Sequence, residues 1–398
     1  MKKPSLALIP SGYKAGKVYS ILPNNGVGDF ILSRNSVATR VNKDGLIEEV
    51  AIDVPRLDYS DVGCPSLLLE PQRTNNILNS ESLSNASWQK FNSGLAATPI
   101  ITDNYAISPS GEMNASRLQM DLNGGTTTSD RAFVRQSLTS QTDYYFSVYL
   151  KSTNGTEQKL NWHFGSDDFL ITVTDEWQRF ELPRSGDATT WAGLGLRGNL
   201  VGAIGIDDSV DILVYGFQVE QGSYATSYIP TYGSIATRVW ERCFDSGNAD
   251  LFNDDEGVLY LETKGFFITL NGYLSLFDGA IGFYTNHIIF QYRTDGNLRV
   301  YVGGLAGSNI NFLISNIDFS ENHKIAFQYQ SLTDNKLFID GVEQTKYVSF
   351  TPTTLSGLNR LDLTINNNTS LAWDGRVKDL RYYDTVLTDA ELQELTTL

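Results

Sequence analysis

Cysteine, histidine and methionine are scarce in this sequence. Its 398 residues include two cysteines, three histidines and three methionines. Cys64 and Cys243 lie far apart and form no CxxC pair, which argues against a zinc site and against a disulfide framework. We therefore expect two free thiols in a reducing compartment.

Long apolar runs are also missing. The basic start resembles a signal peptide only briefly, because the apolar residues 6–9 are followed at once by Pro10 and Gly12. No run approaches the roughly 18 apolar residues of a membrane span. We expect no membrane partner and a protein that is made and kept in a cytoplasm.

Positive charge is in deficit, with 30 Lys and Arg residues against 46 Asp and Glu residues and a formal net charge of −16. Such a surface repels phosphate backbones, so nucleic acid is excluded as a partner. It also disfavours strongly anionic glycans unless a local basic patch exists.

Aromatic residues are abundant, with 20 Tyr and 20 Phe, and they occur in alternating patterns. In residues 144–151, Tyr144, Phe146, Val148 and Leu150 fall on one face of an extended segment. Further apolar runs recur at intervals typical of a sandwich. The pattern predicts an all-β fold: an N-terminal anchoring segment, two antiparallel β-sandwiches of the jelly-roll kind and a short C-terminal helix.

The composition of the sequence and its pattern of apolar runs divide it into four parts. Residues 1–74 form an anchoring or assembly segment, 75–232 a first sandwich, 233–249 a linker and 250–398 a second sandwich. The first part has little apolar sequence of its own, so we expect it to pack against a neighbouring domain or other copies of the chain. Thr388 and Glu391 form a capping box that starts the helix.

Four short motifs near the N-terminus form an ordered set. They are Ala38–Val41, DGLIE at 44–48, PRLDY at 55–59 and LLLEPQRTN at 67–75. The set resembles the leader of bacteriophage head- and tail-fibre or spike proteins, with those of crAss-like and other Bacteroidota phages as the nearest likeness. Residues 82–88, 177–180, 216–220 and 225–231 resemble the carbohydrate-binding-module-like jelly rolls that follow such a leader. Residues 338–342 and 373–395 resemble a laminin-G or concanavalin-A-like sandwich.

This resemblance implies a structural protein of the virion surface that is assembled in the host cytoplasm. The implied partners are other copies of the chain in a homotrimer, other virion proteins bound through the N-terminal segment, and bacterial surface glycans for host attachment. Two alternatives stay open: a glycan-depolymerising enzyme, and a decorative capsid protein without a ligand.

Glycan binding uses flat aromatic rings and amide or carboxylate groups. Tyr149, Trp162 and Trp191 are the candidate binding residues, against the alternative that they are core or interface aromatics. Gly193, Gly195 and Gly198 lack the Lys-Ser/Thr of a phosphate-binding loop, and we interpret them as tight turns.

Catalytic and metal signals are weak. No motif places two carboxylates in the arrangement that glycoside hydrolysis needs, so we predict a protein that is not an enzyme, with no catalytic residues. No cofactor is expected beyond calcium, for which Asp207, Asp208 and Asp211 are candidate ligands, against the alternative of ordinary polar turns.

Overall fold

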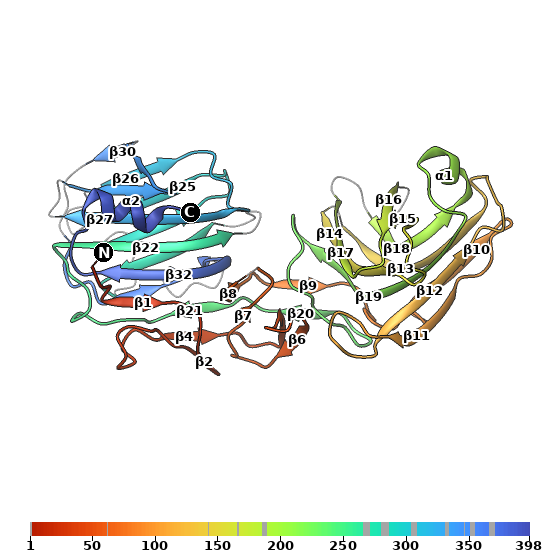
Figure 1. Cartoon of the computed structure of the whole chain (residues 1–398), viewed down its shortest axis with the longest axis horizontal. Coiled ribbons are helices and arrows are strands. Elements are labelled where there is room, and N and C mark those ends of the chain that lie inside the picture. The colour runs from red at the N-terminus through yellow and green to blue at the C-terminus, as the bar shows by residue number, and fades with distance from the viewer. Residues whose placement is uncertain are drawn as a thin grey trace. The chain divides into compact units, whose positions relative to one another are not determined.

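We describe the protein from a computed structural model of the whole chain. The described residues are 2–61, 63–141, 143–164, 167–184, 189–265, 271–279, 286–303, 309–330, 334–345, 347–350, 355–365 and 371–398. The chain divides into two compact units (Figure 1). Unit 1 comprises residues 1–45, 49–72 and 239–398, and unit 2 comprises residues 46–48 and 73–238.

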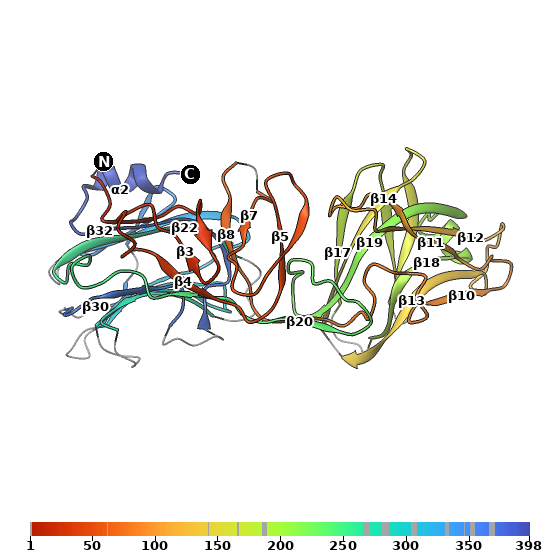
Figure 2. The same ribbon diagram turned by 90° about the horizontal axis from the view of Figure 1, so that it is seen from below.

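Unit 2 is a β-sandwich whose two layers are seen edge-on in Figure 2. One layer, here called the β13 sheet, contains β10 (Gln89–Ser93), β13 (Arg131–Gln141), β18 (Thr189–Arg197), β15 (Gln158–Phe164) and β16 (Asp167–Val173), in that spatial order. The other, the β19 sheet, contains β11 (Ile100–Ala106), β12 (Ala115–Asp121), β19 (Ser209–Gln221), β14 (Tyr144–Ser152) and β17 (Gln178–Arg184). Both are antiparallel, and unit 2 also includes α1 (Gly198–Ala203) and a ribbon of β9 (Arg73–Asn75) and β20 (Ala236–Arg238).

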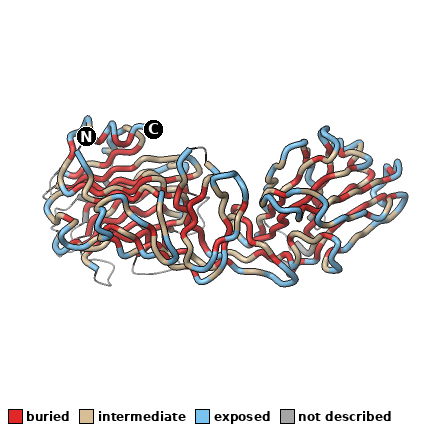
Figure 3. The backbone as a smooth tube through the Cα atoms, turned by 60° about the horizontal axis from the view of Figure 1, so that its bottom comes forward, coloured by how far each residue is buried: buried red, intermediate tan, exposed pale blue. Residues whose placement is uncertain are grey.

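The core of unit 2 lies between these sheets. The predicted alternation in β14 is confirmed, because Tyr144, Phe146, Val148 and Leu150 are all buried in it. In β19 the alternation changes at Gly216, which has a φ of 65° and lies where the pairing with β14 shifts register. Val214 faces the core before this bulge and Phe217 faces it after, because one extra residue reverses the side-chain parity. Figure 3 shows the buried backbone following the strands.

Unit 1 contains a second sandwich. Its larger sheet has the order β29-β28-β27-β22-β32-β8-β7, with β1 also paired to β32. These strands are β29 (Val342–Gln344), β28 (Lys336–Ile339), β27 (Asn322–Gln330), β22 (Glu256–Gly265), β32 (Gly375–Tyr383), β8 (Ser66–Leu69), β7 (Leu57–Asp58) and β1 (Leu6–Leu8). The facing sheet contains β30 (Tyr347–Phe350), β26 (Asn309–Ile314), β25 (Leu298–Gly303), β24 (His287–Tyr292), β23 (Gly272–Phe277) and β31 (Arg360–Asp362).

Smaller elements complete the chain. A small sheet contains β2 (Tyr13–Lys14), β3 (Lys17–Val18), β4 (Phe30–Ser33) and β21 (Arg242–Phe244), and β5 (Ala38–Val41) pairs with β6 (Ile47–Val50). Helix α2 (Asp389–Thr396) packs on β27 and β28, and its predicted capping box is present, with Thr388 as N-cap and Glu391 at the third position. The all-β prediction is thus confirmed.

The N-terminal segment does not stand apart from the C-terminal sandwich. Strands β1 and β8 both pair with β32, so residues from the two ends of the chain share one sheet (Figure 1). The sequence predicted that this segment packs either against a neighbouring domain or against other copies of the chain, and in the structure it packs against the neighbouring sandwich. Hydrophobic burial explains the arrangement, because Leu6, Leu8, Leu67 and Leu69 all enter the core of unit 1.

The leader motifs of the sequence meet in a buried ionic cluster, which we call the Arg56 cluster: Arg34, Arg56, Glu70 and Glu241. All four residues are no more than 1% exposed. Arg56 donates to Glu241 Oε1 at 2.8 Å through Nε and to Glu70 at 2.6 Å through Nη1, and Arg34 donates to Glu241 at 2.8 Å. Two guanidinium groups are therefore balanced by two carboxylates, which is what burial of charge requires.

Both cysteines are free, with Cys64 exposed and Cys243 buried. Burial raises the pKa of the Cys243 thiol. Neither helix in the described part of the chain is long and apolar enough to cross a membrane.

Candidate functional site

The outward face of the β13 sheet carries an unusual set of side chains. In β13, Ala132 and Val134 enter the core, so Phe133 and Arg135 point to the opposite face. Arg131 shares this side of β13, and the same parity in the neighbouring strands brings further rings, another arginine and a carboxylate to it. We call this set the arginine–aromatic face: Phe91, Arg131, Phe133, Arg135, His163, Asp168, Trp191 and Arg197.

Two glycines form the floor of the face. Gly195 lies opposite Phe133 and Gly193 lies opposite Arg135 in the register of β13 and β18. A β-carbon at Gly195 would overlap the ring of Phe133, and one at Gly193 would lie 2.7 Å from Cβ of Arg135. The glycines therefore let the ring and the arginine stem lie flat on the sheet. Their interpretation as turns is wrong, because both lie inside β18.

The Arg135 guanidinium is the centre of the face. Its carbon lies 4.2 Å from the ring centroid of Trp191 and 4.7 Å from that of Phe91. Its Nε donates to Gln89 Oε1 at 2.8 Å, and its Nη1 lies 3.4 Å from His163 Nε2. Stacking and these two hydrogen bonds fix the plane of the guanidinium, while the Nη2 group makes no hydrogen bond to any described residue.

A buried polar network lies beside Arg135. Asp168 accepts from Asn161 at 2.7 Å and pairs with Arg197 at 2.7 Å. His163 lies with Nδ1 at 3.4 Å from Asp168, and its ring stacks on Phe133 with a centroid distance of 4.2 Å. Since arginine only donates, Nε2 of His163 accepts from Arg135 and its Nδ1 carries the proton towards Asp168. The Oδ1 atom of the fully buried Asn161 accepts no hydrogen bond from the described residues.

Positive charge is concentrated on this face. Arg131 lies directly opposite Arg197 in the register, a placement that repels unless an anion compensates it. Of the three arginines, only Arg197 pairs with a carboxylate among the described residues. Burial, followed by the neighbouring charge of Arg131, lowers the pKa of Arg135. The face is thus a local basic patch on an acidic protein.

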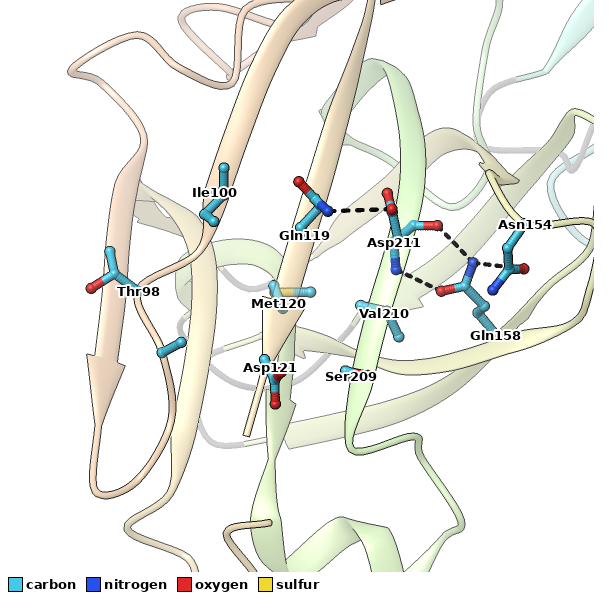
Figure 4. Close-up of a pocket in the computed structure, with 11 residues that line it drawn as sticks. Thr98, Ile100, Gln119, Met120, Asp121, Asn154, Gln158, Ser209, Val210 and Asp211 are labelled. Carbon is cyan, nitrogen blue, oxygen red and sulfur yellow. Dashed lines mark hydrogen bonds between the residues drawn. The ribbon is translucent and has the colours of Figure 1, made fainter. Parts of the chain in front are cut away.

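The opposite side of unit 2 carries a pocket of about 390 Å³ on the outward face of the β19 sheet (Figure 4). Strands β11, β12 and β19 and the start of β15 supply its lining, which includes Ile100, Gln119, Asn154, Gln158 and Asp211. Its polar groups largely satisfy one another. The Gln158 side chain, for example, both accepts from the backbone N–H of Asp211 and donates to its carbonyl, each at 2.6 Å.

The Asp211 carboxylate in this pocket is already neutralised. Arg117 donates to Asp211 Oδ1 at 2.8 Å through Nε and to Oδ2 through Nη2, forming a two-pronged pair. These hydrogen bonds lower the pKa of Asp211 and raise that of Arg117. The described residues that line the pocket include no aromatic ring, so they offer a sugar no surface for stacking. The arginine–aromatic face is the better candidate site.

The predicted glycan-binding residues do not share one surface. Trp191 lies on the arginine–aromatic face and is half-buried. Tyr149 lies on the other sheet, where the guanidinium of Arg179 is 5.6 Å from its ring centroid. Trp162 is 2% exposed and belongs to the core, so its ring is not available to a ligand on the surface. For Tyr149 and Trp191, glycan binding stays a prediction.

The predicted calcium ligands face different partners. Asp207 accepts from the backbone N–H of Lys159 at 2.7 Å, Asp208 from that of Gly124 at 3.2 Å, and Asp211 pairs with Arg117. Within the described ranges, no group of three or more His, Cys, Asp or Glu side chains is arranged to hold a metal ion. The proposed calcium site therefore has no support from these residues.

Sequence reasoning missed most of the face, including Arg135, Phe133 and His163. A usable signal was the alternation in residues 191–197, where Trp, Gly, Gly and Arg occupy every second position. Two small residues between a tryptophan and an arginine on one face of a strand indicate a flat floor flanked by functional side chains.

Residues 269–393 match the family model described as the concanavalin A-like lectin/glucanases superfamily. The C-terminal region thus has the laminin-G or concanavalin-A-like fold that the sequence predicted. No curated protein matches the chain.

Several solved structures resemble the chain at low identity. A carbohydrate-binding module, CBM40, of the Ruminococcus gnavus IT-sialidase, bound to α2,3-sialyllactose, is 16% identical, with 38% of this chain and 93% of that chain covered and a TM-score of 0.32. Domain 4 of AbnA, an extracellular arabinanase from Geobacillus stearothermophilus, in complex with arabinotriose, is 15% identical, with coverages of 44% and 83% and a TM-score of 0.32. The sialidase of Trypanosoma rangeli is 9% identical, with coverages of 96% and 82% and a TM-score of 0.29. At these TM-scores the likenesses carry no argument about this chain.

Proposed function

We propose that the protein binds glycans without cleaving them, and that unit 2 does so through the arginine–aromatic face. The observation that carries the proposal is the pairing of a half-buried Trp191 with the fixed, hydrogen-bond-donating guanidinium of Arg135. The accessible part of the Trp191 ring offers an apolar surface to sugar C–H groups, and the guanidinium offers directed donors to the sugar oxygens. The lectin-like match of residues 269–393 in unit 1 also supports a glycan-binding role.

Binding suits this face better than hydrolysis. Glycoside hydrolysis generally needs two carboxylates on either side of the scissile bond. On the face, the described carboxylate is Asp168, and it is already engaged by Arg197 and Asn161. A depolymerase remains the rival function, and a reducing-end assay on bacterial capsule fragments with the full chain separates the two.

We further propose that the chain is a surface protein of a bacteriophage virion, a head or tail fibre. The support is the resemblance of the leader motifs at 38–41, 44–48, 55–59 and 67–75. In this proposal the N-terminal segment contacts other virion proteins, and homotrimers present several weak glycan sites at once, which raises the overall affinity. Mass photometry of the purified chain tests the trimer, and labelled antibodies on intact particles test the location on the virion.

A glycan array probed with the full chain tests binding. We expect the wild type to bind bacterial surface glycans on the array. We expect W191A to bind them with about tenfold lower affinity, which corresponds to a loss of about 1.4 kcal/mol in binding free energy. The matched control is Y105A, because Tyr105 on the other face of the sandwich also stacks with an arginine, Arg117, at 4.9 Å. Retention of no glycan, or equal binding by W191A and wild type, would contradict the proposal. If wild type, W191A and Y105A all bind glycans equally, the protein binds glycans but not through this face.

A further inference from the structure

The arginine–aromatic face has a chemical preference that can be derived from its charges. The ionised side chains that bear on this preference are Arg131, Arg135, Arg197 and Asp168. Asp168 is paired with Arg197, which leaves two guanidinium groups without a carboxylate partner among the described residues.

Acidic residues outnumber basic ones in this chain, 46 against 30, and several of its arginines pair with a carboxylate. Arg117 on the other face of the sandwich has such a partner, and so do Arg293 and Arg376 in unit 1. Arg135 instead is held by rings and by a neutral amide, Gln89 Oε1.

The orientation of Arg135 is set before any ligand binds. Its Nε donates to Gln89, and its Nη1 lies within hydrogen-bonding distance of His163. The rings of Trp191 and Phe91 pack against the guanidinium. The Nη2 edge is what remains. The N–H groups of Nη2 can donate charge-assisted hydrogen bonds to a carboxylate, and partial burial strengthens that contact.

A second feature of the same face suits a sugar. The half-buried Trp191 ring lies beside the Arg135 guanidinium, with 4.2 Å between the ring centroid and the guanidinium carbon, and it offers an apolar surface to a sugar ring. A ligand that carries a carboxylate on a sugar ring fits both features, and this combination is found in acidic sugars.

We propose that the arginine–aromatic face binds a carboxylate-bearing saccharide, a uronate or sialate residue, with the carboxylate on the Nη2 edge of Arg135. Trp191 flanks the bound sugar ring, and Arg131 adds long-range attraction. This inference rests on the proposed glycan-binding function and narrows it to one chemical class.

The test uses the full chain and pairs of probes that differ only in charge. Oligogalacturonate and oligoglucuronate, and sialyllactose, are each compared with their methyl esters by isothermal titration calorimetry. We expect the free acids to bind about tenfold or more tightly than the esters, as loss of a charge-assisted hydrogen bond implies. We also expect binding of the acids to weaken as salt is raised.

Variants separate the role of the charge from the role of the fold. R135Q is expected to lose the preference for the acid over the ester, whereas R117Q, whose arginine is paired with Asp211 on the other sheet, keeps it. R135K retains the charge but not the two-pronged geometry, and it is expected to fall between R135Q and wild type. Circular dichroism of each variant verifies folding. If R135Q does not fold, Gln89→Ala takes its place: it removes the hydrogen bond that orients Arg135, so a weaker preference for the acid over the ester is expected.

Three outcomes are distinguishable. Preference for the acids, lost in R135Q and kept in R117Q, supports the inference. Equal binding of acids and esters, or an acid preference that survives in R135Q, overturns it while the proposed glycan binding stands. If none of these probes binds and the protein binds only neutral glycans on the array, the preference for acidic sugars is wrong but the proposed glycan binding stands. If the protein binds no glycan on the array, both are wrong.

Discussion

Arginine is used in two contrasting ways in this molecule. In the Arg56 cluster of unit 1, two arginines are fully buried and meet two carboxylates, Glu70 and Glu241. On the arginine–aromatic face of unit 2, Arg131 and Arg135 are half-buried and meet none among the described residues. The first arrangement uses up its hydrogen-bonding capacity inside the protein, whereas the second leaves the Nη2 group of Arg135 without a hydrogen bond to the described residues.

The contrast explains what the leader motifs encode. Arg56 lies in the PRLDY motif and Glu70 in the LLLEPQRTN motif, and they form an ion pair at 2.6 Å. Arg56 and Glu70 of these motifs are therefore explained by the stability of unit 1. Any binding to other virion proteins has to use other residues of the segment.

The largest effect is expected from breaking the Arg56 cluster. E241Q removes the carboxylate that both arginines share and leaves buried positive charge, so we expect a loss of about 3–5 kcal/mol in the free energy of unfolding. Urea unfolding measures it. D295N is the control, because Asp295 forms an exposed pair with Arg293 at 3.0 Å, and solvent screening leaves such pairs little effect on stability. An E241Q protein as stable as D295N would show that the cluster is not structural.

A smaller effect is expected at the glycine floor. G195A would force the ring of Phe133 off the sheet, and overpacking of this kind costs about 1–3 kcal/mol. Both the stability of unit 2 and glycan binding should fall. G202A, with no atom within 4 Å of the added carbon, should leave both unchanged. If a folded G195A protein binds glycans normally, the flat glycine floor is not needed for binding.

Removing Arg135 should affect stability less than removing Glu241. R135Q deletes a charge that has no carboxylate partner and that Arg131 repels, so we expect a change within about 1 kcal/mol in the free energy of unfolding. Urea denaturation followed by fluorescence measures it. A loss comparable to that of E241Q would mean that Arg135 is a structural residue, and the contrast between the two regions would disappear.

The smallest effect is expected at the Arg117–Asp211 pair and depends on pH. Hydrogen bonds from Arg117 lower the pKa of Asp211, so its ionised form favours the folded state. That contribution is present above the ordinary aspartate pKa of about 4 and is lost as the pH falls below it through the lowered value. D211N should therefore reduce stability by less than about 1 kcal/mol at pH 7 and by less still in strong acid. An equal loss at both pH values would indicate that the pair acts through packing alone.

The sequence predicts the fold better than it predicts the site. Alternating residues such as 144–151 and the capping box at Thr388 depend on neighbours in the chain, so local periodicity reveals them. The arginine–aromatic face is assembled from four strands that lie far apart in the sequence, and its register is fixed only when they pair. Trp162 illustrates the same limit, because its burial depends on Phe146 and Phe217 from other strands.

The most direct test of the central claim is the NMR signal of the Arg135 Nε–H group, assigned by comparison with R135Q, in the full chain. On addition of a glycan that the protein binds, we predict that this signal shifts while those of Arg56 and Arg117 stay in place. A shift at Arg117, with Arg135 unaffected, would place the ligand on the other face of the sandwich and contradict the account.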